Sequence, residues 1–273
     1  MRHIEVMREP IAELAFVPTM GALHDGHLAL IKKAKNFGGQ VLVSVYVNPT
    51  QFESSADLAK YPKTLERDLE LASSAGADYL WTPSVDEIYP EGLANVKFVP
   101  AGALGDLYEG ASRPNHFSGV LTVINRLFTI TNPQYAIFGE KDFQQLFLIR
   151  KFARESFPNI NIISGETIRD KNGIALSSRN SRLNEEELVV AQVLPRAQQV
   201  VKTSNELTSI KAALSKVFGE QSGFTLDYAE IVDPLTLQPV STSFTGQVQV
   251  LMAGWVGSVR LIDNFSHYVK GRS

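Results

Sequence analysis

The 273-residue sequence contains no cysteine, no long hydrophobic run and no excess of positive charge. Without cysteine there can be no disulfide, no thiolate metal site and no thiol nucleophile, so the chemistry must use oxygen and nitrogen groups. No stretch of about 18 uncharged apolar residues occurs, and the first ten residues lack the apolar core of a secretory signal. These absences predict a cytoplasmic protein with no membrane partner.

The balance of charge excludes another class of partner. Lys and Arg total 26 and Asp and Glu total 29, which gives a formal net charge of −3. Such a chain has no global positive field to hold nucleic acid, so any anion must be bound by local groups. Hydrophobic residues make up 44% and charged residues 20%, which is ordinary for a globular protein of one large or two modest domains.

Short apolar runs alternate with segments of helical period through the first part of the chain. Strands are predicted at 14–17, 40–47, 79–82, 135–138 and 160–164, with helices at 27–36, 64–75, 119–131 and 143–155. This alternation predicts an α/β, Rossmann-like parallel sheet with helices on both faces. Residues 102–117 have no clear period and are predicted to form a functional loop or lid.

The pattern changes after Arg169. Helices are predicted at 184–202 and 207–218, and strands at 226–232 and 248–255, as expected for a smaller α+β domain. We therefore expect a Rossmann-like domain at 1–169 and a smaller C-terminal domain at 170–273 that closes over the site.

Two histidines follow the first predicted strand, in the segment 18–27 with the sequence PTMGALHDGH. At the carboxyl end of a parallel strand, the free N–H groups of a helix N-terminus bind phosphate. His24 and His27 share one helix face, so both can reach one anion. Either one alone is typical of a capping or surface residue, and no third ligand at an obvious spacing supports a metal site. The pair, with Gly21 and Gly26, favours phosphate binding.

Two further clusters follow later strands. Segment 46–52 (YVNPTQF) carries the amides of Asn48 and Gln51, which suit a small molecule with hydroxyls and a carboxylate, although Asn-Pro also marks a plain turn. In segment 138–145 (FGEKDFQQ), Lys141 stands where a phosphate can lie and Gln145 comes one helical turn later. A solvated turn is the alternative for this charged run.

A fourth cluster, segment 176–180 (LSSRN), follows a turn at 169–173 (RDKNG). Two hydroxyls and a guanidinium in succession can hold a polyphosphate, and no interleaved aromatics indicate nucleic acid. The alternative is a surface loop. Its place near the predicted domain boundary favours a binding role, because clefts form there.

Together these segments resemble a known family. The histidine box is similar to the H-x-G-H signature of the nucleotidylyltransferase and class I aminoacyl-tRNA synthetase superfamily, and segment 176–180 is similar to its phosphate loop. With 48–52, 61–64 (YPKT) and 139–145, they resemble the pantothenate synthetases, or pantoate:β-alanine ligases. The resemblance extends from about residue 16 to residue 264. It departs at Asn115, where that family usually has glycine.

The resemblance implies an ATP-dependent condensation of pantoate with β-alanine through a pantoyl adenylate, releasing pyrophosphate and AMP, in a homodimer that uses Mg²⁺. It implies catalytic roles for His27, His24, Lys141 and Arg179. The residues implied to bind ATP are Met20, Gly21, His24, His27, Gly139, Glu140, Lys141, Asp142, Ile168, Leu176, Ser177, Ser178 and Arg179. The residues implied to bind pantoate and β-alanine are Gln51, Gln145, Asn48 and Tyr61. The residue implied to bind Mg²⁺ is Asp68.

Two other hypotheses remain open from the residues. Another small-molecule nucleotidylyltransferase, such as a phosphopantetheine adenylyltransferase, would share the histidine box but resembles only the first domain. A catalytically inactive nucleotide-binding regulator is a hypothesis of a different class. The presence of His24, His27, Lys141 and Arg179 argues against inactivity.

Overall fold

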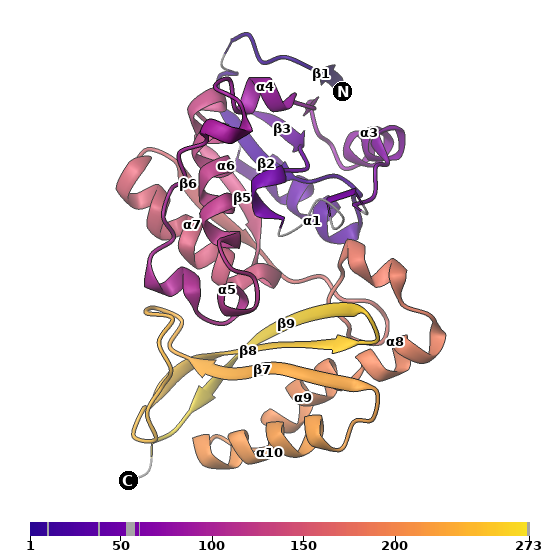
Figure 1. Ribbon diagram of the computed structural model, residues 1–273, viewed down its shortest axis with the longest axis vertical. Helices are drawn as coiled ribbons and strands as arrows, with labels where there is room; N and C mark the ends of the chain where they lie inside the picture. Colours follow the sequence, from indigo (N-terminus) through magenta and orange to yellow (C-terminus); the bar gives the residue numbers. More distant parts are fainter. Residues whose placement is uncertain (10, 38, 53–57, 60, 272–273) are drawn as a thin grey trace. The chain divides into compact units, whose positions relative to one another are not determined.

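The computed structural model describes residues 1–9, 11–37, 39–52, 58–59 and 61–271 (Figure 1). The chain divides into two compact units. The first unit comprises Met1–Glu140 and Gln144–Glu166, and the second comprises Lys141–Phe143 and Thr167–Ser273. Three residues that directly follow a strand of the first unit therefore belong, by their contacts, to the second.

A parallel sheet organises the first unit. Its strands, in the order β1-β4-β3-β2-β5-β6, are β1 (Arg2–Ile4), β4 (Tyr79–Trp81), β3 (Gln40–Val45), β2 (Leu14–Thr19), β5 (Tyr135–Gly139) and β6 (Asn161–Gly165). Every neighbouring pair is parallel. The direction in which strands are added reverses between β2 and β5, and in open α/β sheets ligands bind at the carboxyl ends of the strands at such a point.

Helices of the first unit pack on both faces of this sheet. They are α1 (Asp25–Ala34), α3 (Leu65–Ser74), α4 (Val85–Ile88), α5 (Glu109–Ser112), α6 (His116–Thr131) and α7 (Phe143–Ser156). Ala15 and Val17 of β2 share a buried cluster with α1 and α3, whereas Leu14 and Phe16 share another with α6 and α7. Because side chains alternate along a strand, one apolar run serves both layers. The predicted Rossmann-like architecture is confirmed.

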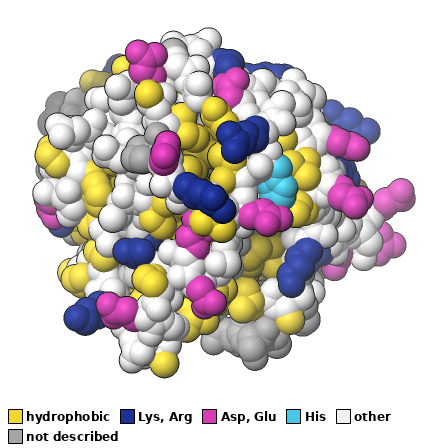
Figure 2. All heavy atoms as spheres, turned by 90° about the horizontal axis from the view of Figure 1, so that it is seen from above, with side chains coloured by type: hydrophobic (Ala, Val, Ile, Leu, Met, Phe, Trp, Pro, Cys, Tyr) yellow, Lys and Arg dark blue, Asp and Glu magenta, His cyan; other side chains and the backbone are white. Residues whose placement is uncertain are grey.

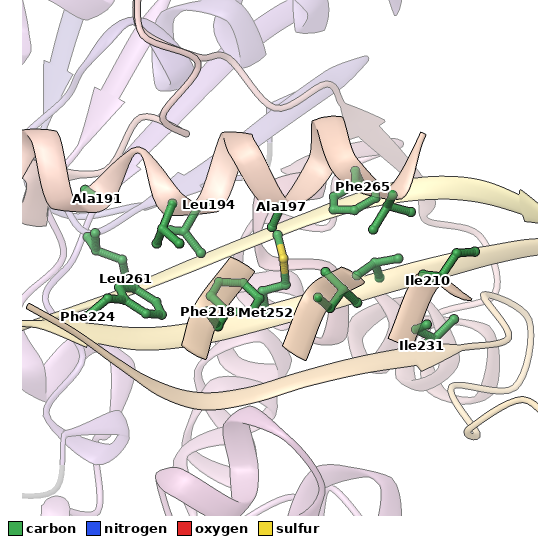
Figure 3. Close-up of a cluster of buried hydrophobic side chains, with 14 of the residues drawn as sticks. Ala191, Leu194, Ala197, Ile210, Phe218, Phe224, Ile231, Met252, Leu261 and Phe265 are labelled. Carbon is green, nitrogen blue, oxygen red and sulfur yellow. The ribbon is translucent and has the colours of Figure 1, made fainter. Parts of the chain in front are cut away.

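The second unit is an α+β layer pair. Its helices are α8 (Glu185–Ala191), α9 (Val193–Val201) and α10 (Leu207–Gly219), and its antiparallel sheet has the order β7 (Phe224–Val232), β8 (Gly246–Val256), β9 (Val259–Val269). Leu194 of α9, Ile210 of α10, and Met252 and Phe265 of the sheet belong to one buried cluster, which lies between the helices and the sheet in Figure 3. The predicted smaller α+β part is confirmed.

Some predicted elements differ from the structure. The helix predicted at 184–202 is broken at Gln192 into α8 and α9. Pro195 accounts for the break, because it lacks an N–H for the carbonyl four residues earlier and its ring clashes with that carbonyl. Strands β1 and β9 were not predicted, because β1 is a short exposed segment and Asp263 and Asn264 interrupt the apolar pattern of β9.

Six 3-10 helices complete the described secondary structure; they are η1 (Lys35–Phe37), η2 (Pro49–Gln51), η3 (Leu93–Asn95), η4 (Ala103–Asp106), η5 (Glu140–Asp142) and η6 (Ser178–Arg182). An ion pair joins η1 to Asp78, the residue before β4. Lys35 Nζ lies 3.0 Å from Asp78 Oδ2, which also accepts a 2.8 Å hydrogen bond from the Val41 N–H. Partial burial acts to raise the pKa of Asp78, but these two donors outweigh it and hold the pKa below its ordinary value.

Candidate active site

The two histidines lie at the N-terminus of α1, directly beyond β2. His24 is the N-cap: its Nδ1 accepts a 3.1 Å hydrogen bond from the Gly26 N–H, and His27 Nδ1 accepts one of 3.3 Å from the His24 N–H. The ring centroids are 4.1 Å apart. Because each Nδ1 is an acceptor, the proton of each neutral ring sits on Nε2. The pair therefore carries two Nε2–H groups at a helix start whose Gly26, His27 and Leu28 N–H groups already bond to His24.

Gly26 makes this arrangement sterically possible. A Cβ at Gly26 would lie 2.8 Å from His24 Cε1 and 3.0 Å from His24 Nδ1. The glycine between the histidines therefore gives the first ring room to fold back over the helix start. This is a local steric reason for the H-x-G-H spacing.

Asp68 of α3 holds the turn that leads into the histidines. Gly21 and Ala22 both have positive φ angles, +82° and +51°. The Ala22 N–H donates to Asp68 Oδ2 at 3.0 Å and the Leu23 N–H donates to Oδ1 at 2.7 Å, while the Thr64 hydroxyl contacts both oxygens. Asp68 is 1% exposed. The buried carboxylate thus compensates a backbone conformation that a non-glycine residue rarely adopts.

A network of buried amides follows β3. Asn48 Nδ2 donates to Gln51 Oε1 at 3.1 Å, and Gln51 Nε2 in turn contacts Met20 Sδ at 3.0 Å. The Tyr89 hydroxyl donates to Asn48 Oδ1 at 2.8 Å. Burial raises the pKa of Tyr89, so its hydroxyl keeps the proton that it donates. Asn48 uses its oxygen and its nitrogen within the protein, and it fixes the direction of the Gln51 amide.

Helix α6 packs closely against this network. A Cβ at Gly119 would lie 2.2 Å from the Thr50 carbonyl oxygen, and Asn48 Nδ2 also donates to the Gly119 carbonyl at 3.2 Å. His116 Nδ1 bonds the Gln51 carbonyl at 3.0 Å, so it carries the ring proton, and Nε2 accepts from Arg113 Nη1 at 2.9 Å. Tyr89, His116 and Gly119 were missed from the sequence because each joins the site across 38 or more residues of chain.

The second unit brings three of the predicted phosphate-binding residues together. One pocket is lined by Lys141, Ile174, Ala175, Ser177, Arg179, Asn180, Leu194, Arg260, Leu261 and Ile262. The Ser177 Oγ accepts from the Arg179 N–H at 3.3 Å and caps η6. Lys141 Nζ lies 3.8 Å from Asp142 Oδ2. Three basic residues and a serine therefore line one small pocket, as suits phosphate binding, and one of the three, Arg260, pairs with Asp227.

The other residues implied by the resemblance take these places. Gly139 ends β5, Glu140 and Asp142 lie in η5, Gln145 lies in the first turn of α7, and Ser178 begins η6. The Leu176 N–H donates to the Ile168 carbonyl at 2.9 Å, which joins those two residues. Tyr61 stacks edge-on against Phe52 with ring centroids 5.9 Å apart.

The segment predicted as a lid is partly ordered into η4 and α5. Gln144 Nε2 donates to the carbonyls of Leu104 (2.9 Å) and Leu107 (2.8 Å), and its Oε1 accepts from the Glu109 N–H at 3.1 Å. Asn115, at the N-cap of α6, has φ +64° in the left-handed region. Asparagine tolerates this conformation better than most residues, which explains how it replaces glycine.

The Mg²⁺ site that the resemblance implies at Asp68 stays a prediction. No group of three or more His, Cys, Asp or Glu side chains that could hold a metal occurs among the described residues. Both oxygens of Asp68 already accept hydrogen bonds.

Among the described residues, no helix is both long and apolar enough to span a bilayer. On the face in Figure 2, basic and acidic side chains are interspersed.

The switch point of a Rossmann-like sheet, two histidines at a helix start and a Lys-Ser-Arg pocket define a nucleotide-binding α/β protein. The model of the pantoate–beta-alanine ligase family matches residues 1–266, so the chain belongs to that family. The known reaction of this family is the ATP-dependent ligation of pantoate to β-alanine, and the chain is an enzyme of this kind.

Individual relatives agree. A pantothenate synthetase from Aeromonas hydrophila is 44% identical over 256 residues, which cover 92% of this chain and 89% of that protein. The crystal structure of pantothenate synthetase from Thermus thermophilus has a TM-score of 0.89 at 40% identity, covering 97% of this chain and 99% of that one. The ligase from Francisella tularensis, complexed with beta-gamma ATP and β-alanine, has a TM-score of 0.78 at 35% identity and covers 97% of each chain.

The extent of these matches decides between the hypotheses. A different nucleotidylyltransferase would resemble only the first unit, whereas the family match continues through β8 and most of β9. The predicted family and activity are thus confirmed.

Proposed function

We propose that the enzyme works in two half-reactions. The pantoate carboxylate attacks the α-phosphorus of ATP, a P–O bond breaks and pyrophosphate leaves. The β-alanine amine then attacks the acyl carbon of the pantoyl adenylate and AMP leaves with the bonding electrons. The first step builds negative charge on the phosphates, which positioned cations and N–H donors stabilise. The observation that carries the proposal is the pocket shared by Lys141, Ser177 and Arg179.

Each proposed ATP-binding group has a simple physical task. His24 and His27 donate through Nε2 to phosphate oxygens, because their Nδ1 atoms are occupied by backbone N–H groups. Lys141 and Arg179 neutralise the charge of the departing pyrophosphate. The remaining proposed nucleotide contacts are Met20, Gly21, Gly139, Glu140, Asp142, Ile168, Leu176, Ser177 and Ser178.

For pantoate and β-alanine we propose two kinds of residue. Gln51 and Gln145 bind pantoate through its hydroxyl and carboxylate, and Tyr61 contributes to the same substrate region. Asn48 acts one step further away: it is 1% exposed and its amide is used by Gln51, Gly119 and Tyr89. Asn48 is therefore a positioning residue for the Gln51 amide.

Mg²⁺ enters the proposal as part of the substrate MgATP. Mg²⁺ usually keeps waters and phosphate oxygens as its main ligands, so it needs few protein groups. We assign Asp68 to holding the turn at Gly21 and Ala22, since its oxygens already bind two backbone N–H groups. On family likeness alone, we further propose a cytoplasmic homodimer in which the C-terminal domain contributes to closing the site.

The experiment that tests this proposal measures the two half-reactions separately, by rapid quench in single turnovers. Lys141→Ala and His27→Ala should each slow adenylate formation by about 10²- to 10³-fold, the effect of losing one preorganised electrostatic group. Attack of β-alanine on preformed pantoyl adenylate involves no pyrophosphate and should be much less affected.

Lys151→Ala is the matched control, because the Lys151 side chain of α7 is 57% exposed and pairs with Glu155 in the following turn. It should leave both rates unchanged. A Lys141→Ala enzyme with normal adenylate formation and slow amine attack would overturn the assignment of Lys141.

A further inference from the structure

Lys141 is held in the second unit through its main chain as well as through its side chain. The Lys141 carbonyl accepts a 2.7 Å hydrogen bond from Asn264 Nδ2 of β9. Asn264 is 6% exposed, so this bond is shielded from water. The bond ties η5 to the sheet of the second unit, although η5 directly follows β5 of the first unit in sequence.

The Asn264 amide is itself oriented by a neighbour. Gln249 Nε2 of β8 donates to Asn264 Oδ1 at 2.6 Å, and Gln249 is also buried. This donor requires the amide oxygen of Asn264 to face Gln249, so the amide nitrogen must face Lys141. The direction of the hydrogen bond to Lys141 is thereby fixed.

The preceding residue of β9, Asp263, connects this contact to the second phosphate-binding segment. Arg169 forms a two-point ion pair with Asp263, at 2.7 Å to Oδ2 and 2.8 Å to Oδ1, and the Asp263 side chain is fully buried. Arg169 also donates to the carbonyls of Gly173 (3.0 Å) and Asn264 (3.2 Å). It therefore clamps the turn that precedes Ser177.

From this network we infer that Asp263 and Asn264 are positioning residues, which set the spacing between Lys141 and the Ser177–Arg179 segment. The two segments are separated by 35 residues of sequence, and β9 joins both through adjacent side chains. A displaced ammonium loses much of its stabilisation of a transition state, because positioning errors of about 1 Å cost on the order of 10²-fold. This inference rests on the proposed role of Lys141 in pyrophosphate release.

The test is a double-mutant cycle between Asn264→Asp and Lys141→Ala, read as pantoate-dependent pyrophosphate release. Asn264→Asp keeps an oxygen for Gln249, replaces the donor to Lys141 with a carboxylate oxygen that repels the Lys141 carbonyl, and adds one negative charge, as the control substitution below also does. It should lower kcat by about 10- to 100-fold, with the KM for pantoate unchanged. In the Lys141→Ala background, the same change should cost less than about 3-fold, because coupled residues are not additive.

Asn95→Asp is the matched control. Asn95 Nδ2 donates to the Glu91 carbonyl at 2.8 Å on an exposed 3-10 helix, so the same kind of bond is lost away from the site. We expect a rate within about 2-fold of the unchanged enzyme.

Two results would overturn the inference: an unchanged kcat in Asn264→Asp, or an equal loss with and without Lys141. If Lys141→Ala itself releases pyrophosphate normally, the proposed role of Lys141 fails instead, and the two failures are distinguishable. If the Asn264→Asp enzyme does not fold, Gln249→Met replaces it in the same double-mutant cycle with Lys141→Ala. It leaves Asn264 in place but frees its amide, and the loss should again vanish without Lys141.

Discussion

The substitution Asp68→Asn separates the two roles assigned to this carboxylate. Asp68 receives the Ala22 N–H on one oxygen and the Leu23 N–H on the other. An asparagine has one acceptor oxygen, so in either orientation its NH₂ faces one of these N–H groups. An unsatisfied buried donor costs about 1 to 3 kcal/mol, and the lost bonds are charge-assisted. We expect the free energy of unfolding to fall by about 2 to 3 kcal/mol.

The assay combines urea unfolding with activity measured against Mg²⁺ at fixed ATP. If Asp68 holds the turn, the variant loses stability equally with and without Mg²⁺, and its maximal rate falls while the Mg²⁺ concentration for half-activation stays constant. Glu70→Gln on the exposed side of α3 removes the same charge and should change neither quantity. Activity that returns at high Mg²⁺, with normal stability, would refute this reasoning and assign Asp68 to the metal.

Three further outcomes are expected. Gln51→Ala should raise the KM for pantoate about 10- to 100-fold and that for ATP far less in steady-state assays; equal effects on both would contradict its assignment. Gly26→Ala should change stability little, because the gain of about 1 kcal/mol in helix propensity is offset by the loss of about 1 kcal/mol when the displaced His24 ring no longer caps α1. It should nevertheless slow adenylate formation, and a normal single-turnover rate would count against the steric argument. Asp78→Asn should lower the free energy of unfolding by no more than about 1 kcal/mol at pH 7, because Asp78 and Lys35 form an exposed ion pair. Since the pKa of Asp78 is lowered, its charged form stabilises the fold at pH values above the ordinary pKa of an aspartate, and pH 7 lies in that range. This difference should disappear in urea unfolding as pH falls through the folded pKa, and a difference that persists there would exclude the Lys35 pair as its source.

Much of the fold follows from local pattern. Strands β2 to β6 and helices α1, α3, α6 and α7 are long or strongly apolar segments bounded by polar turns, so their period is visible in the sequence. The histidine box could also be found locally, because His24, Gly26 and His27 interact with one another within one helix start. The order of the motifs along the chain can also be read without the structure, and it already indicated the family.

Tertiary structure alone decided how the side chains are used. Asn48 and Asp68 are predicted from the sequence as ligand-binding groups, and only the structure shows that they also bond to Tyr89, Gly119 and the backbone at residues 22 and 23. The Lys141 carbonyl accepts a hydrogen bond from Asn264, which lies 123 residues away in a strand that was not predicted from the apolar pattern. A hydrogen bond across such a separation leaves no periodic signal, since neither partner needs a particular neighbour in sequence. The sequence therefore determined which chemical groups are present, and packing between distant segments determined which of them bond to one another.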